Sequence, residues 1–227
     1  MGKVFTAMRL ISLLHMKPIK ISYDKPIKSF FPNDREVLIC LFPFYYQVFA
    51  DNYNWQGNLD KTFPLLNPIN WKVISKDIGF NSLERLALGV LGLNKTLRAE
   101  LEEYCEWKHI DFPDYAMDRI PEVVLVPLIR YCQSMGVKEL EVRPVDRFPD
   151  SEFKTISVEQ RNAFEIYSEI ENSKFISFVQ GFDILLPDYD CPYAIISGER
   201  EKCSDIISNC NLEYIVTTEK TQFDWWN

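Results

Sequence analysis

Three aspartates in the C-terminal third are the residues best suited to chemistry. Asp183 lies in an apolar run, and Asp188 and Asp190 flank Tyr189 in the segment LPDYDCPY. Carboxylates this close together can bind a hard cation or act as a general acid and base. Asp and Pro are also the residues that tight turns favour. The pattern favours a turn between strands, and it leaves open an acidic cleft at Asp188 and Asp190 that would belong to a small-ligand binder or an enzyme.

Cys105 and His109 form a weaker candidate, for a metal. They are four residues apart, so a helix would place both side chains on one face. Zinc requires three or four protein ligands, and the chain contains only two histidines. We therefore predict no metal site, and interpret the pair as a packed cysteine and a surface histidine.

Motifs for covalent catalysis or cofactor binding are absent from the sequence. It contains no G-x-S-x-G, no catalytic cysteine signature and no glycine-rich phosphate loop. We therefore predict no catalytic residue and no cofactor, and the sequence leans towards a protein that is not an enzyme.

The segment 71–93 has the outline of a helix-turn-helix. Two amphipathic stretches flank a short turn that contains Gly79, and residues 70–98 carry five basic and two acidic side chains, a net charge of +3. A helix that reads DNA needs several polar side chains on one face, and here the second helix offers only Glu84 and Arg85. A buried helical hairpin is favoured, and a DNA-binding regulator remains an alternative.

The charge of the whole chain indicates the kind of partner. Its formal net charge is −8. Nucleic acid and anionic membranes both attract clustered Lys and Arg, so neither is favoured as a partner. No apolar run reaches the roughly 18 residues that a membrane span requires. We expect a cytoplasmic protein that meets a basic protein partner.

The six cysteines are scattered without C-x-x-C pairs, and most lie in apolar runs. A reduced thiol packs as a small hydrophobic group, and a chain of 227 residues needs no disulfides for stability. We therefore expect free thiols in a reducing compartment.

Residues 174–218 predict the main sheet. Runs rich in β-branched and aromatic residues end at Gly181, Pro187 and Gly198, and their short spacers favour hairpins. A helix then precedes a last strand at 214–216, which could lie parallel to a neighbour. Further strands are expected near 37–42 and 138–143.

The rest of the chain predicts helices, including one near the N-terminus. The middle helices are expected at 71–78, ended by Gly79; from Ser82 as N-cap; and from Thr96 as N-cap. A long helix should begin near Pro121, with Pro127 causing a kink or a later start. The stretch ISVEQRNAFEIYSEIEN predicts one amphipathic helix that Ser157 opens.

Trp225 and Trp226 close the aromatic tail 217–226. Two adjacent indoles in water would expose a large apolar area, so the tail either docks on the domain or anchors a partner. We favour docking.

The runs FVQGFDILLPDYDCPYAIISG and EKTQFDWW, with the segments VLICLFPFYYQVF and IGFNSLERLALGVLG, resemble DUF2711, a family of uncharacterised bacterial proteins. The resemblance implies a bacterial, cytosolic, single-domain protein, and it transfers no catalytic residue. We predict one α+β domain over 1–227, helix-rich at 71–135 and sheet-rich at 138–218. Its mainly antiparallel sheet should be covered by N-terminal and middle helices. The favoured function is non-catalytic interaction, of an immunity-like or regulatory kind.

Overall fold

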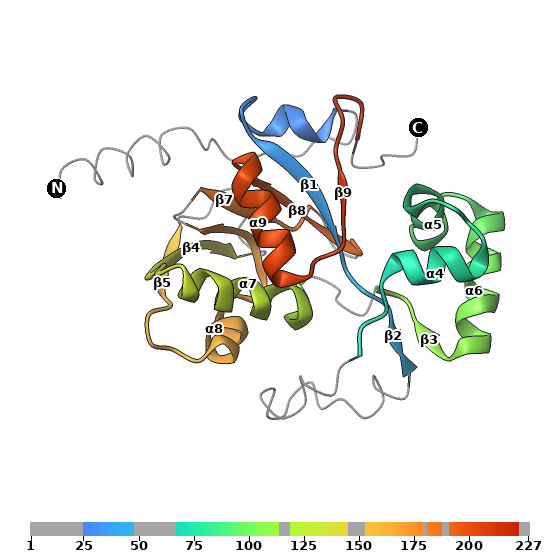
Figure 1. Cartoon of the computed structure of the whole chain (residues 1–227), viewed down its shortest axis with the longest axis horizontal. Coiled ribbons are helices and arrows are strands. Elements are labelled where there is room, and N and C mark those ends of the chain that lie inside the picture. The colour runs from blue at the N-terminus through green and yellow to red at the C-terminus, as the bar shows by residue number, and fades with distance from the viewer. Residues whose placement is uncertain are drawn as a thin grey trace.

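The computed structural model describes residues 25–47, 67–113, 119–144, 153–178, 181–187 and 191–222 (Figure 1). In these ranges six α-helices accompany a sheet of seven strands, which confirms the α+β prediction. The predicted N-terminal helix lies outside the described residues. Among the described residues, no helix combines the length and the apolar character needed to cross a membrane.

The sheet has the strand order β5-β4-β6-β7-β8-β1-β9, and every neighbouring pair is antiparallel. The predicted sheet is therefore confirmed, and the suggestion that its last strand could run parallel is wrong. The strands are β1 (Glu36–Leu41), β4 (Glu139–Pro144), β5 (Lys154–Ser157), β6 (Ser173–Phe178), β7 (Phe182–Leu185), β8 (Tyr193–Gly198) and β9 (Tyr214–Val216).

The central strands are apolar on both faces because both faces are covered. All six residues of β8 are buried. Successive side chains of a strand point to opposite faces, so Ile195 and Ile196 enter two different cores. A continuous apolar run is typical of a strand enclosed on both sides.

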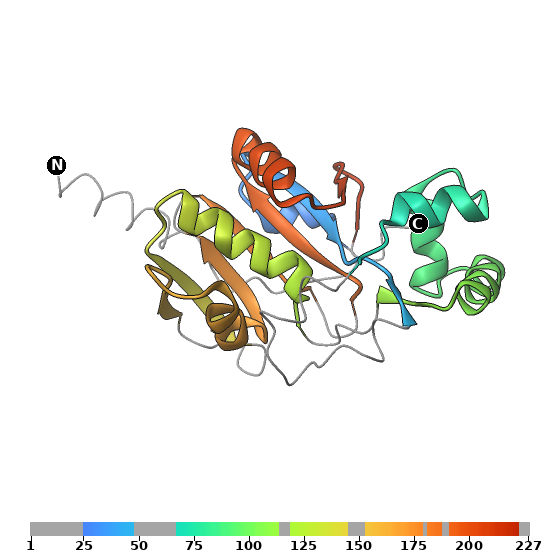
Figure 2. The ribbon, with the colours of Figure 1, turned by 60° about the horizontal axis from the view of Figure 1, so that its bottom comes forward.

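One core lies between the sheet and three helices, α7 (Glu122–Ser134), α8 (Ala163–Ile170) and α9 (Arg200–Cys210). Figure 2 shows these helices together on one side of the sheet. Their apolar faces bury Ile129, Ile166 and Ile206 completely or nearly so. The prediction that middle helices cover the sheet holds for α7, and α8 and α9 cover the same face from the sheet-rich part of the chain.

The second core extends from the other face of the sheet into a group of three helices, α4 (Trp71–Ile78), α5 (Leu83–Val90) and α6 (Lys95–Lys108). These helices lie at one end of the molecule with the small ladder of β2 (Tyr45–Tyr46) and β3 (Ile110–Asp111) (Figure 1). Trp71 is fully buried at the junction, where its indole N–H donates to the Phe42 carbonyl at 2.7 Å. One cluster thus links Ile39 of the sheet to Leu101 of α6. Whether the chain is a single domain stays a prediction.

Two of the predicted helix ends are confirmed and one is wrong. Gly79 ends α4 in the left-handed conformation, with φ of 84°, and the Ser82 hydroxyl accepts the N–H of Arg85 at the start of α5. The predicted N-cap Thr96 lies inside α6. Asn94 caps this helix instead, and its side-chain oxygen accepts the N–H groups of Thr96 and Leu97.

The predicted helix from Ser157 is also wrong at its start. Residues 154–157 form β5 against β4, and α8 begins at Ala163 after the N-cap Asn162. Gln160 lies between them with a positive φ of 58°, which ends the extended chain. The helix α7 starts at Glu122 and continues through Pro127, so the predicted later start does not occur.

All six cysteines are free thiols, and only Cys191 is partly exposed. This agrees with the packing role that the sequence predicts for them.

Candidate interaction surface

The predicted acidic residues are divided by the structure. Asp183 is described, on β7. The other candidates, Asp188, Tyr189, Asp190, Trp225 and Trp226, lie outside the described residues, as does most of the predicted turn. The acidic cleft and the docked tail therefore stay predictions.

Asp183 belongs to a polar row that crosses three strands. It lies opposite Ser177 of β6 and Ser197 of β8, so the three side chains share one face of the sheet. The Asp183 carboxylate accepts a hydrogen bond from the Ser177 hydroxyl at 2.6 Å and forms an ion pair with Arg35. Asp183 is 3 % exposed. Its carboxylate is thus committed to partners inside the protein.

Burial raises the pKa of Asp183, and the positive charge of Arg35 and the hydrogen bond from Ser177 oppose this increase. The Ser197 hydroxyl beside it is buried and has no hydrogen-bond partner in the described part of the chain. Arg35 precedes β1, so the ion pair ties the beginning of this strand to β7. The cluster therefore links β6, β7 and the chain just before β1.

The helix-turn-helix segment forms the predicted helical hairpin. In α5, Leu86, Ala87 and Val90 face the core, and only Glu84 and Arg85 are exposed. The Arg85 guanidinium lies over the Phe80 ring at 5.6 Å. The second helix therefore presents little polar surface to a groove.

The predicted packing of Cys105 and His109 is also observed. Cys105 is 2 % exposed, whereas His109 is exposed and ends α6 in the left-handed conformation. Over the ranges described here, no three His, Cys, Asp or Glu side chains converge in a manner that could hold a metal ion.

The most unusual exposed side chain is Trp107, near the end of α6. It is 70 % exposed, although tryptophan is among the residues with most to gain from burial. The inner face of α6 buries Leu97, Leu101 and Cys105, which are spaced four residues apart. Trp107 follows Cys105 by two residues and therefore points away from this buried face. It lies seven residues after Glu100 and four after Glu103, so these three side chains share one face of the helix.

Neighbouring side chains hold the Trp107 ring in place. The Lys108 ammonium lies 3.9 Å from the ring centroid, and the Tyr104 ring packs edge-on at 6.3 Å. The Tyr104 hydroxyl donates to Asp77 of α4 at 2.9 Å. Burial and this hydrogen bond raise the pKa of Tyr104. The indole is therefore presented on a supported platform and has less rotamer freedom to lose on binding.

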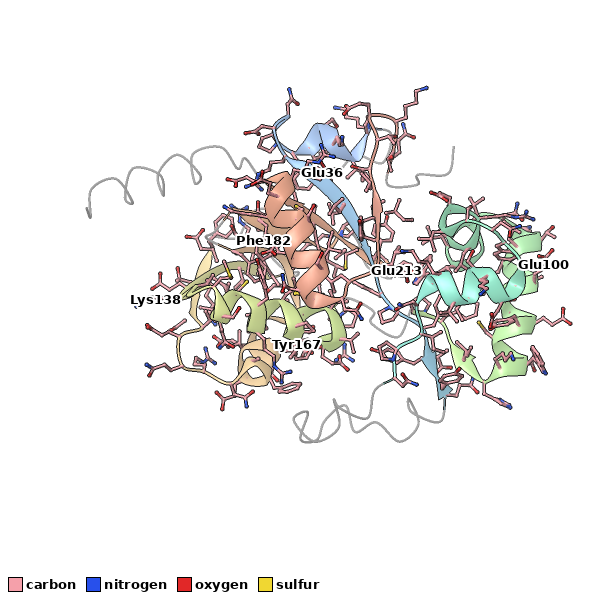
Figure 3. All side chains as sticks on the ribbon, viewed as in Figure 1. Glu36, Glu100, Lys138, Tyr167, Phe182 and Glu213 are labelled. Carbon is pink, nitrogen blue, oxygen red and sulfur yellow. The ribbon has the colours of Figure 1, made fainter. Side chains whose placement is uncertain are left out.

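Trp107, Glu100 and Glu103 form a stripe along the outer face of α6, which we call the α6 stripe. Both glutamates are exposed and have no ion-pair partner among the residues that the structure describes. Figure 3 shows Glu100 at the end of the molecule, on the side away from the sheet.

Arg98, one of three basic residues of α6, has its partners away from the stripe. Arg98 donates to Glu102 at 2.6 Å and to the Val90 carbonyl at 2.8 Å, and its guanidinium lies 4.1 Å from the centroid of Phe112. These contacts hold the charge of Arg98 against α5 and its own helix. The stripe therefore combines an aromatic anchor with two exposed carboxylates.

The sequence reasoning missed the α6 stripe. A helical wheel of KTLRAELEEYCEWK would have placed Trp107 opposite Leu101 and Cys105 and in line with the two glutamates. The sequence contains this pattern, but the partner surface was predicted at Trp225 and Trp226 of the aromatic tail instead.

Comparison with known proteins agrees with the resemblance noted in the sequence. Residues 23–227 match a family described as protein of unknown function (DUF2711). No curated protein and no solved structure matches the chain. The match covers most of the sequence, from the residues before η1 (Ile27–Phe30) to the last residue. The chain therefore belongs to DUF2711, a family whose function is unknown.

Proposed function

We propose that this protein is a non-catalytic interaction protein that binds a basic protein partner through the α6 stripe. The observation that carries the proposal is the 70 % exposure of Trp107 beside two exposed glutamates. Tryptophan and tyrosine are enriched among the residues that dominate interface energies. An exposed indole held by Tyr104 and Lys108 is a suitable anchor.

Charge supports a basic partner. Glu100 and Glu103 are exposed carboxylates, and the whole chain carries a net charge of −8. Complementary charge speeds encounter and sets the orientation of the partner, and it rejects acidic proteins. Trp107 would bury apolar area in the complex, and the glutamates would favour basic over acidic partners.

The substitution Trp107→Ala tests this proposal. The immobilised full chain is exposed to a lysate of the source cells, and the retained proteins are quantified by mass spectrometry. We expect at least one basic protein whose retention falls about tenfold or more with W107A, because hot-spot residues contribute about 2 kcal/mol or more. The free energy of unfolding should change little, since the indole is exposed.

Met135→Ala is the matched control. Met135 is 51 % exposed at the end of α7, on another part of the surface. The partner should be retained by M135A and lost with the double substitution E100K/E103K, and its retention should fall as salt rises. Equal retention by wild type and W107A, or retention of acidic proteins only, would show that the proposal is wrong.

A further inference from the structure

A pocket of about 310 Å³ lies where α7, the chain after α9 and the approach to α4 meet. Its walls include Pro43, Val124 and Leu212. This volume is at the lower end of the roughly 300–1,000 Å³ that small-molecule sites occupy. None of its lining residues belongs to the α6 stripe, so a ligand site here is independent of the proposed function.

Pro127 interrupts the hydrogen bonding of α7 in the wall of this pocket. Pro127 lies inside the helix and has no N–H. The Val123 carbonyl, four residues earlier, therefore lacks the donor that it would have in a regular helix. Val123 and Pro127 both line the pocket. A carbonyl without its helical donor is a strong acceptor that can serve a ligand.

Glu213 supplies a second acceptor in the lining. One carboxylate oxygen accepts the backbone N–H of Trp71 at 2.5 Å, and the other accepts that of Lys72 at 3.0 Å. Each carboxylate oxygen can accept a further hydrogen bond. Figure 3 shows Glu213 between the sheet and the start of α4. Asn70 and Asn211 also line the pocket, and the Asn70 side chain makes no capping bond to α4.

We propose that this pocket binds a small primary amine, with its apolar body against Pro43 and Leu212 and its ammonium N–H groups on the Val123 carbonyl and the Glu213 carboxylate. An ammonium carries three donors and a positive charge, which suits the Val123 carbonyl and the Glu213 carboxylate, and the side-chain oxygens of Asn70 and Asn211 offer further acceptors in the lining. An anion would meet the charge of Glu213. A neutral apolar ligand would cover both acceptors without giving them donors, which is unfavourable.

The surroundings of Glu213 are consistent with this ligand. Burial raises the pKa of its carboxyl group, and the hydrogen bonds from Lys72 and Trp71 oppose the increase. A bound cation would favour the ionised form, because opposite charges at close range stabilise each other.

The test is a two-dimensional NMR titration of the full chain with benzylamine. Benzyl alcohol and benzoate are matched probes of the same apolar body with a neutral and an anionic head. We expect benzylamine to shift the amide signals of residues 123–128 and 211–213. The alcohol should bind about tenfold more weakly, because it lacks the charge-assisted hydrogen bond, and benzoate should cause no shifts there.

Two substitutions locate the amine. Glu213→Gln keeps an oxygen that can accept from the α4 N–H groups but removes the charge, so we expect about tenfold weaker binding. Pro127→Ala gives the Val123 carbonyl its helical donor, so we expect about fivefold weaker binding together with a higher melting temperature. The control Glu201→Gln removes an exposed charge from α9 that lines a different pocket, and it should leave binding unchanged.

The inference is wrong if benzyl alcohol or benzoate binds as tightly as benzylamine at these residues. It is equally wrong if the folded protein shows no shifts at the solubility limit of the amine, or if P127A and E213Q both bind with wild-type affinity. Because P127A should stabilise the protein, its weaker binding could not be attributed to unfolding.

Discussion

Asp183 and Glu100 are carboxylates in opposite surroundings. Asp183 is 3 % exposed and compensated by Arg35 and Ser177, whereas Glu100 is exposed and has no ion-pair partner among the described residues. Asp183 therefore interacts only with groups inside the protein, whereas the charge of Glu100 can interact with other molecules. Residue type alone does not separate these two roles, because the difference arises from burial and from a partner 148 positions away.

Arg35→Ala should destabilise the protein in a pH-dependent manner. At about pH 7.5 we expect a loss near 3 kcal/mol in the free energy of unfolding, because a buried carboxylate is left without its counter-charge. The pKa of Asp183 is already raised by burial, and removal of Arg35 raises it further. Between the unfolded and folded pKa values the folded state binds more protons, so its stability increases as pH falls. Urea unfolding at several pH values should therefore show the difference from wild type shrinking towards acid.

Lys138→Ala is the control for this experiment. Lys138 forms an ion pair with Glu159 at 3.0 Å, but its side chain is 71 % exposed. Exposed pairs contribute about 0–1 kcal/mol, so K138A should change stability little. A loss for R35A that does not decrease at acidic pH would contradict the role given to Asp183.

The thiols should be unreactive in the native state. Burial raises the pKa of Cys40 to about 12 and that of Cys203 to about 11, so the reactive thiolate is scarce near neutral pH. A thiol reagent analysed by intact mass should label at most the partly exposed Cys191 quickly, and all six cysteines in denaturant. Rapid native labelling of several sites would contradict the observed packing.

At the scale of the elements, the N-terminus of α6 allows a test of which residue caps this helix. Asn94→Ala should lower the free energy of unfolding by about 1 kcal/mol, because two backbone N–H groups lose their acceptor. Thr96→Ala should change it by less than about 0.5 kcal/mol, since Thr96 is an exposed residue within the helix. Thermal or urea unfolding of both variants provides the comparison, and a larger effect at Thr96 would restore it as the cap.

The sequence predicted the elements whose residues agree with their surroundings. Strands β6, β7 and β8 are long apolar runs between turn residues, and both faces of β8 are buried. Strand β5 was missed because it lies at the edge of the sheet and buries only Ile156. The apolar residues of β5 and of the following α8 have a spacing that fits a single helix. The chain leaves the extended conformation at Gln160, whose positive φ cannot be predicted from its side chain.

At the scale of the whole molecule, the second core should make the helical end and the sheet unfold together. The cluster that contains Ile195 of β8 also contains Leu101 of α6, and Trp71 joins them. In native-state hydrogen exchange the amides of Leu101 and Ile195 should open with free energies within about 1 kcal/mol of each other. A markedly lower value in α6 would indicate that α4–α6 form a separate unit, contrary to the single-domain prediction.

The strand order places β1 between β8 and β9, although β1 is near the beginning of the chain. Its partners therefore emerge from the ribosome more than 150 residues later: Ile39 faces Ile195 on one side and Ile215 on the other. Until then the apolar residues 37–41 have no sheet to join. Pairing across such distances slows folding and leaves apolar surface exposed during synthesis. The sheet can close only after the last fifth of the chain has been synthesised. Until then the apolar residues of β1 can bind chaperones.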